Sequence, residues 1–279
     1  MGQSYAESNA AMVAIVSTFQ KLVSYLGASL IRRINDAGAV GIYLGDVIRQ
    51  AFSRPFRWTL ILEQLEFIGN QSLGIIVLTA FFTGAAFALS IGPFFQNFKA
   101  ESIMGAATAI SLARELAPLM TAFLMIGRAG SAMTAELSTM RVGEQIDAME
   151  AMGVDPISYL VVPRVIGSMV ILPLLCGIFV FVGVIAAYVI GRGMFSVDTG
   201  IFFEKITWLA DSKDVTLGLQ KSFIFAFVIG AMSCRFGLRA GGGAKGVGLA
   251  TTNGVVTCLL AVLACDYVIT YIQLVLRPE

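Results

Sequence analysis

Five long apolar runs constrain the fold of this chain more strongly than any other feature of its sequence. They lie near residues 68–95, 103–127, 160–190, 217–237 and 250–275. A helix of about 20 apolar residues is long enough to cross the hydrocarbon core of a bilayer. Hydrophobic residues also make up 57% of the chain and charged residues 13%, which is more apolar surface than a soluble core could bury. The sequence therefore predicts an all-α integral membrane protein with about five transmembrane helices.

Residues 1–60 precede the first membrane span and show a different pattern. Between residues 12 and 30, apolar side chains follow the i, i+3, i+4, i+7 spacing of an amphipathic helix, and Gln20 and Lys21 lie on its other face. These two polar residues make the segment a poor signal peptide. We expect an interfacial amphipathic helix on the inner surface of the membrane. The chain would then divide into an interfacial helical segment, 1–60, and a membrane domain, 61–279.

Basic residues predict the orientation of the spans. The first long apolar run follows five arginines, Arg32, Arg33, Arg49, Arg54 and Arg57. Because basic residues favour the cytoplasmic side, we expect the N-terminus in the cytoplasm. With about five spans, the C-terminus and the loop at residues 192–214 then lie outside. The odd number of spans and the absence of a visible internal repeat argue against secondary transporters built from paired halves.

Arg114 and Glu115 lie in the second apolar run, where each ionised side chain costs roughly 2.5–3.5 kcal/mol on insertion scales. Adjacent helical residues point about 100° apart, so these two side chains cannot neutralise each other on one face. Pro118 cannot bond the carbonyl of residue 114 and is expected to kink the helix beside the charges. Lys221 and Asp266, in the fourth and fifth runs, are the candidate partners. Lys221 could instead extend to the outer headgroups.

These charges have two interpretations, and the residues alone do not decide between them. A buried ion-pair network could pin the helices together, or the charges could contact a substrate. On the second interpretation, replacing Arg114 and Glu115 together with apolar residues should leave folding intact, because both burial costs disappear, yet abolish function.

Residues 141–156, RVGEQIDAMEAMGVDP, predict an acidic amphipathic helix between the second and third spans. Its apolar positions are Val142, Ile146, Met149 and Met152, and its charged positions are Arg141, Glu144, Asp147 and Glu150. Gly153 supplies a helix stop, and Pro156 prevents continuation. The segment could be a solvated loop, but methionines favour a surface that repacks against a partner. We therefore interpret it as a cytoplasmic docking helix.

Small residues recur at every fourth position in three stretches of the apolar runs. The three sets are Gly84, Ala88 and Gly92; Gly127, Ser131 and Ala135; and Gly183, Ala187 and Gly191. Each set gives a flat helix face that allows close packing, either within the chain or at a subunit interface.

Several classes of function are disfavoured. The chain has no histidine and 4 cysteines without a CxxC pair, so it lacks the usual metal sites and catalytic nucleophile arrangements. Its 19 basic and 18 acidic residues give no net field for nucleic acid. The glycine run at residues 239–248 is not a phosphate loop, because Lys245 is followed by glycine. Any ATP would therefore bind another chain. A membrane enzyme that uses carboxylates such as Glu136, Glu144 and Asp147 remains an alternative.

A long motif occupies residues 112–156 and reads LARELAPLMTAFLMIGRAGSAMTAELSTMRVGEQIDAMEAMGVDP. Further stretches follow, PRVIGSMVILPLL at residues 163–175 and, more weakly, GVGLATTNGVVTCLLAVLACDYVIT at residues 246–270. Together they resemble the MlaE permease family, the membrane subunits of bacterial ABC-type phospholipid transporters. The likeness covers about residues 66–276, which would make 61–279 an MlaE-type permease domain.

The resemblance implies a homodimer in the bacterial inner membrane that moves glycerophospholipids and maintains outer-membrane lipid asymmetry. Two cytoplasmic ABC ATPase subunits would hold ATP and Mg²⁺, so that this chain needs no cofactor. A small STAS-domain protein would accompany the ATPases, and a hexamer of MCE-domain subunits would cap the permeases in the periplasm. A related permease for sterols or other lipids, and a scaffold that transports nothing, remain the alternatives.

The resemblance also assigns roles to individual residues. Arg114, Glu115 and Lys221 match polar positions of a lipid cavity between the two permeases, and Asp266 joins them as a predicted partner. Phe98 stands where some relatives have tyrosine, which puts a polar headgroup contact there in doubt. The helix expected to enter the ATPase cleft carries Arg141, Glu144, Gln145, Asp147, Met149, Glu150 and Met152.

Overall fold

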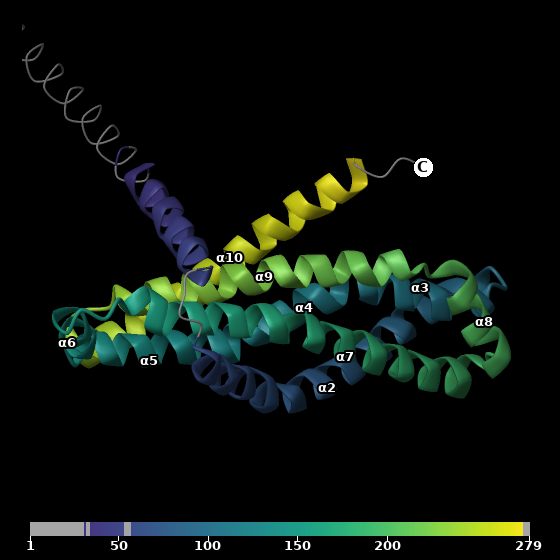
Figure 1. The fold of residues 1–279 in the computed structure, drawn as a ribbon. Helices are drawn as coiled ribbons and strands as arrows, with labels where there is room; N and C mark the ends of the chain where they lie inside the picture. Colours follow the sequence, from purple (N-terminus) through teal and green to yellow (C-terminus); the bar gives the residue numbers. More distant parts are fainter. Residues whose placement is uncertain (1–30, 32–33, 53–56, 276–279) are drawn as a thin grey trace, which may run out of the picture. The chain divides into compact units, whose positions relative to one another are not determined.

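The computed structural model describes residue 31, residues 34–52 and residues 57–275 (Figure 1). Contacts divide the chain into two units, Met1–Phe52 and Ser53–Glu279. In the first unit, residues 34–51 are helical. The amphipathic helix predicted between residues 12 and 30 lies outside the described residues, and the predicted boundary at residue 60 stays a prediction.

The second unit contains five helices that are long and apolar enough to span a membrane, which confirms the predicted all-α membrane fold. Three of these spans are continuous α-helices: α2 (Trp58–Asn97), α9 (Ser212–Leu238) and α10 (Gly243–Val275). The other two spans, Met104–Val142 and Ile157–Phe195, are assembled from shorter helical pieces. All five extend beyond the apolar runs that predicted them, because polar residues continue several of the helices at their ends.

The second span alternates between α-helical and π-helical turns. Its pieces in chain order are α3 (Met104–Ser111), η2 (Leu112–Leu116), α4 (Ala117–Met125), η3 (Ile126–Gly130) and α5 (Ser131–Val142). The η2 and η3 pieces are π-helical. At the end of η2, the Ala117 N–H donates to the Leu112 carbonyl five residues back. Pro118 follows at once, so the predicted local distortion takes the form of a widened turn beside Arg114 and Glu115.

The third span consists of the π-helical η4 (Ile157–Val161) and α7 (Val162–Phe195), and α7 packs along α2 through small residues. Gly84, Ala88 and Gly92 are buried on α2, as are Gly183, Ala187 and Gly191 on α7. A Cβ added to Gly84 would lie 2.2 Å from the Gly183 carbonyl oxygen, so the backbones touch where only glycine fits. The predicted close packing is therefore confirmed for these two sets.

The connections between spans contain short helices. The 3-10 turn η1 (Glu101–Ile103) follows α2, and α6 (Gln145–Ala151) lies between the second and third spans. The segment at 192–214 was predicted as a loop, but it contains the helix α8 (Thr199–Leu209), which packs against α3. Asp198 accepts hydrogen bonds from the Gly200 and Ile201 backbone N–H groups and so caps α8 at its start.

Candidate functional site

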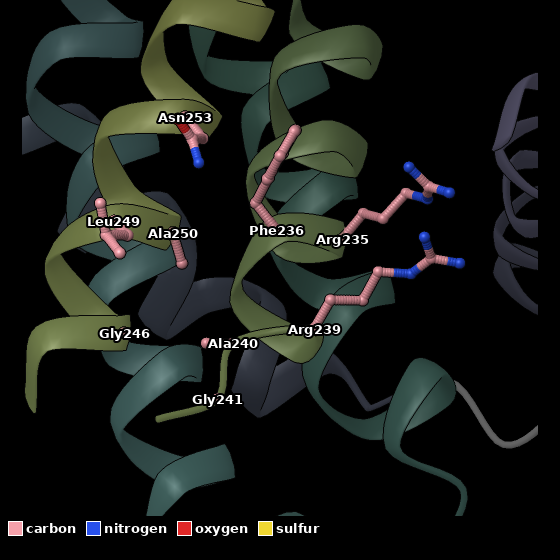
Figure 2. Close-up of a pocket in the computed structure, with 9 residues that line it drawn as sticks. All are labelled: Arg235, Phe236, Arg239, Ala240, Gly241, Gly246, Leu249, Ala250 and Asn253. Atoms are coloured by element: carbon pink, nitrogen blue, oxygen red, sulfur yellow. The ribbon is translucent and has the colours of Figure 1, made fainter. Parts of the chain in front are cut away.

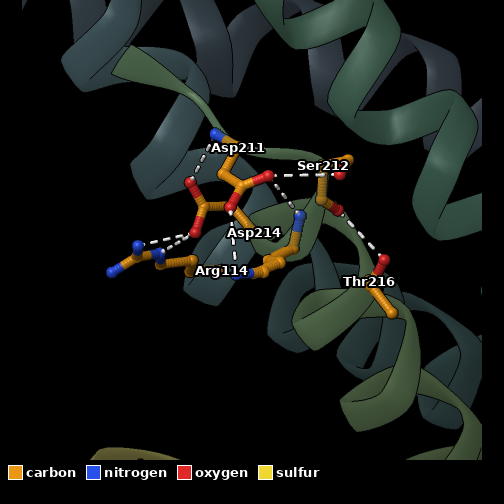
Figure 3. A network of polar contacts seen from close by, with 6 residues as sticks. Arg114, Asp211, Ser212, Asp214 and Thr216 are labelled. Carbon is orange, nitrogen blue, oxygen red and sulfur yellow. Dashed lines mark hydrogen bonds and ion pairs between the residues drawn. The ribbon is translucent and has the colours of Figure 1, made fainter. Parts of the chain in front are cut away.

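Arg114 and Asp214 form an ion pair between the second and fourth spans (Figure 3). The Arg114 Nε and Nη2 atoms both donate to Asp214 Oδ1, at 2.8 and 2.6 Å. The Asp214 side chain is 3% exposed, whereas the Arg114 side chain is 39% exposed. The carboxylate is therefore buried, while part of the guanidinium group still faces outward.

Asp214 also helps to begin α9. Its Oδ2 accepts the Asp211 backbone N–H at 3.2 Å, and the Asp211 side chain in turn accepts the Asp214 backbone N–H, which forms a capping box (Figure 3). The Asp211 side chain also accepts the Lys213 backbone N–H. The hydrogen bond from the Lys213 backbone, aided by Ser212, lowers the pKa of the Asp211 carboxyl group. The two oxygens of Asp214 thus have different partners, one for the start of α9 and one for Arg114.

Lys221 joins three helices through a second group of charges. Its Nζ lies 2.6 Å from Glu115 Oε2 of η2 and 3.2 Å from Asp266 Oδ1 of α10. Nζ also donates to the Thr270 hydroxyl at 2.7 Å. The Lys221 side chain is 0% exposed, so the prediction that it could extend to the headgroups is wrong. We refer to Arg114, Glu115, Asp214, Lys221 and Asp266 as the charge cluster.

The charge cluster lies near the middle of the apolar length of the bundle. On α2, the stretch from Leu73 to Phe95 contains no charged or amide side chain, spans about 35 Å and has Gly84 at its midpoint. Leu112, in the same π-helical turn as Arg114, packs with Ala80 in one hydrophobic core cluster. Ala80 is about one helical turn from that midpoint. The cluster therefore needs its internal ion pairs, because ionised side chains within an apolar span are costly unless they are paired.

The formal charges of the cluster do not balance: two cations face three carboxylates. The sequence correctly predicted that Arg114 and Glu115 do not neutralise each other and that Lys221 is a partner of this pair, through Glu115. Asp266 belongs to the same group, but it pairs with Lys221 and not with Arg114. The sequence missed Asp214, because the fourth span was expected to begin near residue 217. The signal was present, since Asp211 and Asp214 have the spacing of a capping box.

These pairings revise the expectation for the double apolar replacement. Removing Arg114 and Glu115 together would leave the buried Asp214 without Arg114, and Lys221 with Asp266 as its one remaining counterion in the cluster. A buried charge that has lost its partner strongly destabilises a protein. A double substitution that removes charge without leaving a buried charge unpaired must therefore replace a cation together with the carboxylate that binds it.

A close backbone contact fixes the geometry of the cluster. A Cβ added to Gly218 of α9 would lie 1.9 Å from the Ala113 carbonyl oxygen, next to Arg114. Glycine therefore allows α9 and η2 to approach until the two ion pairs form. Phe98 does not belong to this group, because it follows the end of α2, about 27 Å along the helix from Ala80. Its ring is exposed and packs on Phe94 with centroids 4.9 Å apart.

The predicted docking segment ends as expected, but its predicted start is wrong: Arg141 and Val142 belong to α5, and α6 begins at Gln145 after a turn of the chain at Glu144. The Gly153 N–H bonds the Glu150 carbonyl and the Val154 N–H bonds the Met149 carbonyl, with Gly153 at φ +76°. Ile146 is 1% exposed, so part of the predicted apolar face is used within the protein. The exposed positions are Val142, Glu144, Gln145, Asp147, Glu150 and Met152, while Met149 and Arg141 are half-buried.

Charge on this exposed surface is partly neutralised, because Arg141 donates to Asp147. Glu144 has a left-handed backbone, with φ 56°, at the sharp turn between α5 and α6. Its side chain and that of Glu150 are exposed. The helix therefore presents carboxylates and Met152 to a potential partner.

Glu136, one of the carboxylates considered for enzymatic chemistry, is paired with Arg164. The Arg164 Nη2 lies 2.9 Å from Glu136 Oε1, and Arg164 Nη1 donates to the Leu160 carbonyl. Asp147 is paired with Arg141, as described above. Within the described part of the chain, no three Cys, Asp or Glu side chains are grouped so as to hold a metal ion.

A pocket of about 340 Å³ lies where α9 turns into α10 (Figure 2). Its lining residues are Arg235, Phe236, Arg239, Ala240, Gly241, Gly246, Leu249, Ala250 and Asn253. Figure 2 shows the Arg235 and Arg239 guanidinium groups pointing away from α10. The glycines here allow a tight turn, with Gly242 and Gly243 at positive φ. This geometry agrees with the interpretation of residues 239–248 as a turn between spans.

Five membrane-spanning helices, a buried interhelical charge cluster and a short helix between two spans define a multi-pass membrane protein of the transporter type. A family model described as Permease MlaE matches residues 61–272. The chain belongs to the MlaE permease family and is an ABC transporter permease.

Curated relatives support the same assignment over most of the chain. A probable ABC transporter permease protein of Synechocystis is 40% identical over 212 residues, which cover 76% of this chain and 81% of the relative. A probable ABC transporter permease protein of Rickettsia prowazekii is 36% identical over 250 residues, covering 90% of this chain and 96% of the relative. The chloroplastic protein TRIGALACTOSYLDIACYLGLYCEROL 1 of Arabidopsis thaliana is 34% identical over 232 residues, covering 83% and 66%.

Proposed function

We propose that this permease moves glycerophospholipid between the bacterial inner membrane and a periplasmic MCE-protein carrier, and thereby maintains outer-membrane lipid asymmetry. The charge cluster carries the proposal. Arg114 and Glu115 keep 39% and 46% of their side chains exposed, although their depth is that of the hydrocarbon core. An amphipathic substrate needs such a polar surface beside apolar walls, because its headgroup must cross the same depth as its acyl chains.

The proposed complex is a homodimer in which the two lipid paths face each other. Two cytoplasmic ABC ATPases with bound ATP and Mg²⁺ would supply the energy, a STAS-domain protein would accompany them, and an MCE hexamer would receive the lipid. The exposed carboxylates and Met152 of α6 support its role as the ATPase contact, since charge complementarity steers such docking. No cofactor is proposed within this chain.

A related lipid is the second candidate substrate. The name of the Arabidopsis relative contains that of a galactolipid. Lipids other than glycerophospholipids therefore stay candidate substrates. The charge cluster offers both carboxylates and a guanidinium group, so it could bond sugar hydroxyls as well as a phosphodiester.

Reconstituted lipid transfer tests the proposal most directly. The complete complex is placed in proteoliposomes with labelled phospholipid, and ATP-dependent transfer is measured for the wild type and for Arg114→Gln with Asp214→Asn. This double variant removes one whole ion pair, so folding should persist, whereas transfer should fall. Arg164→Gln with Glu136→Gln is the matched control, since it removes another ion pair and should retain transfer.

The outcomes separate transporter from scaffold. Equal transfer by the first double variant and the wild type would refute the role of this cluster in the lipid path. An assembled wild-type complex that hydrolyses ATP but transfers no lipid of any class would instead identify the chain as a scaffold.

Orientation is tested separately. Topology reporters at residue 150 and in the N-terminal segment should be cytoplasmic, and those at residue 205 and the C-terminus periplasmic, because basic loops stay inside. A cytoplasmic C-terminus would contradict the proposed orientation.

A further inference from the structure

Arg128 lies in η3 and is held against α2 by neutral groups. Its Nη1 donates to the Phe67 carbonyl oxygen at 2.7 Å and to the Ser72 hydroxyl at 3.1 Å, and its Nη2 donates to the Gln71 side-chain oxygen. The guanidinium carbon also lies 4.9 Å from the centre of the Phe67 ring. These contacts fix the position of the cation, but none of them neutralises its charge.

Arg128 has no Asp or Glu oxygen within ion-pair distance in the part of the chain that the structure describes. A guanidinium group has five N–H donors, and three of them are used here. The Nε–H and one Nη2–H bond therefore have no acceptor among the described residues. The side chain is partly exposed, so that a ligand can reach these donors.

The surroundings of Arg128 leave room on the outside of the bundle. The preceding residue, Gly127, is exposed, and a Cβ added to it would meet nothing within 4 Å. Asn70 and Gln71, two consecutive residues of α2, are also exposed. The cation is thus part of a small polar surface that the other described helices of the second unit leave uncovered.

The depth of Arg128 indicates what covers this surface. Its partners Phe67, Gln71 and Ser72 lie immediately before Leu73, where the long apolar stretch of α2 begins. The hydrocarbon core of a bilayer is roughly 30 Å thick and the stretch is about 35 Å long, so Arg128 lies at one edge of that core. Phospholipid phosphates lie at this edge, and arginine binds phosphate oxygens with two parallel N–H bonds.

We propose that Arg128, oriented by Gln71 and Ser72, binds the phosphate of a phospholipid in the adjacent leaflet. The lipid phosphate supplies a negative charge that none of the described residues places beside Arg128, and its acyl chains continue along the apolar length of α2. This site differs from the charge cluster in depth and in the type of partner. It does not depend on the proposed function, because a scaffold protein would bind the same lipid.

Lipid binding to the purified full-length chain tests the site. After delipidation, native mass spectrometry measures binding of dioleoylphosphatidylglycerol, dioleoylphosphatidylcholine and the phosphate-free lipid dioleoylglycerol. In Arg128→Gln the two phospholipids should bind at least about tenfold more weakly than in the wild type, since a charge-assisted bidentate contact is lost. Lys213→Gln, which also removes one exposed positive charge, should bind them like the wild type.

Conservative replacement and competition sharpen the assignment. Arg128→Lys keeps the charge but loses the planar fork, so its phospholipid binding should fall between those of the wild type and Arg128→Gln. Inorganic phosphate at the lipid concentration should displace no phospholipid. Displacement by inorganic phosphate, equal binding of dioleoylglycerol, or unchanged phospholipid binding in Arg128→Gln would each overturn the proposal.

A crosslinking experiment covers the case in which Arg128→Gln fails to fold. A photoreactive benzoylphenylalanine replaces Asn70, which accepts none of the Arg128 hydrogen bonds, and is activated in membranes that contain radiolabelled phospholipid. Labelled lipid attached to this chain supports the site. Crosslinks to a neighbouring polypeptide without lipid would show that protein rather than lipid covers this surface and would refute the proposal.

Discussion

Arg114 and Arg128 lie in the same membrane span, yet they satisfy their positive charge in opposite ways. Arg114 uses its Nε and Nη2 atoms to bind the buried Asp214, and Lys221 is likewise held by Glu115 and Asp266. Arg128 is held by a backbone carbonyl, a hydroxyl and an amide oxygen. The comparison contrasts two ways to accommodate a cation: Arg114, near the middle of the apolar length, is paired with an anion of the chain, whereas Arg128, at its edge, keeps N–H donors that no described residue accepts.

The two regions should respond differently when charge is removed. A cation within the charge cluster has buried carboxylates that depend on it, so its loss leaves an uncompensated charge. Loss of Arg128 leaves only neutral acceptors, some of which water can reach. Unfolding can be followed with a thiol-reactive dye, because Cys176, Cys234 and Cys258 are buried in the folded state.

Replacement of Lys221 is expected to have the largest effect. Lys221→Met leaves Glu115 and Asp266 facing each other without a cation, which should cost roughly 3–5 kcal/mol of stability. The triple variant that adds Glu115→Gln and Asp266→Asn should recover most of this loss, since no charge remains. Thermal unfolding of the purified chain with the thiol-reactive dye measures both. A single variant as stable as the wild type would contradict the ion-pair network.

The two arginines give the direct test of the comparison. Arg114→Gln should destabilise the protein toward the lower end of roughly 3–5 kcal/mol, because Asp214 loses its counterion although solvent reaches the guanidinium group. Arg128→Gln in the same detergent should change stability by about 1 kcal/mol or less, as hydrogen bonds to neutral groups contribute little net stability. Equal losses in the two variants would remove the distinction between the two regions.

Glycines beside the two arginines extend the test to packing. Gly218→Ala should cost roughly 1–3 kcal/mol, because the new methyl group meets the Ala113 carbonyl and pushes α9 away from Arg114. Gly127→Ala, next to Arg128, should be neutral or stabilise by up to about 1 kcal/mol, since the space is open and alanine favours a helix. The shift in unfolding temperature should therefore have opposite signs, or at least very different sizes, for these matched changes.

The exposed helix α6 provides a reference with the smallest effect on stability. Glu144→Lys with Asp147→Lys disrupts one exposed ion pair, so the stability of the isolated chain should change by about 1 kcal/mol or less. Binding to the ATPase should nevertheless be lost, because attraction at the contact becomes repulsion. Co-purification with the ATPase and stimulated ATP hydrolysis provide the measurements. Normal assembly in this variant would show that α6 is only a solvated connection.

The sequence predicted the residues of the site that are costly to bury as charges in an apolar run. It missed the features of the site that depend on contacts between helices. The price of charge in an apolar run identified Arg114, Glu115, Lys221 and Asp266 as a group that needs partners. Which atoms pair depends on how closely the helices approach, and Gly218 allows an approach that no local pattern shows. Asp214 was missed for a further reason, since an apolar window excludes the capping residues that begin a span.

The fold shows the same division between local pattern and packing. Apolar length was sufficient for five spans and their order, and Gly153 ended α6 as its sequence indicated. The helix α8 was missed because Phe202 is buried against neighbouring helices rather than by a periodic pattern of its own. The π-helical turns were also missed, as a single extra residue in a turn leaves composition and hydropathy unchanged.

The two π-helical turns of the second span have a consequence for the spacing of its functional residues. A π turn holds one residue more than an α turn, so each advances the angular phase of all later side chains by about 100°. Deleting one residue from η2 would preserve almost every chemical group in the span, yet rotate the Arg128 side chain away from α2. The number of residues between Arg114 and Arg128 therefore determines the angle between their side chains around the helix axis. With this spacing, one arginine points toward α9 and the other toward α2.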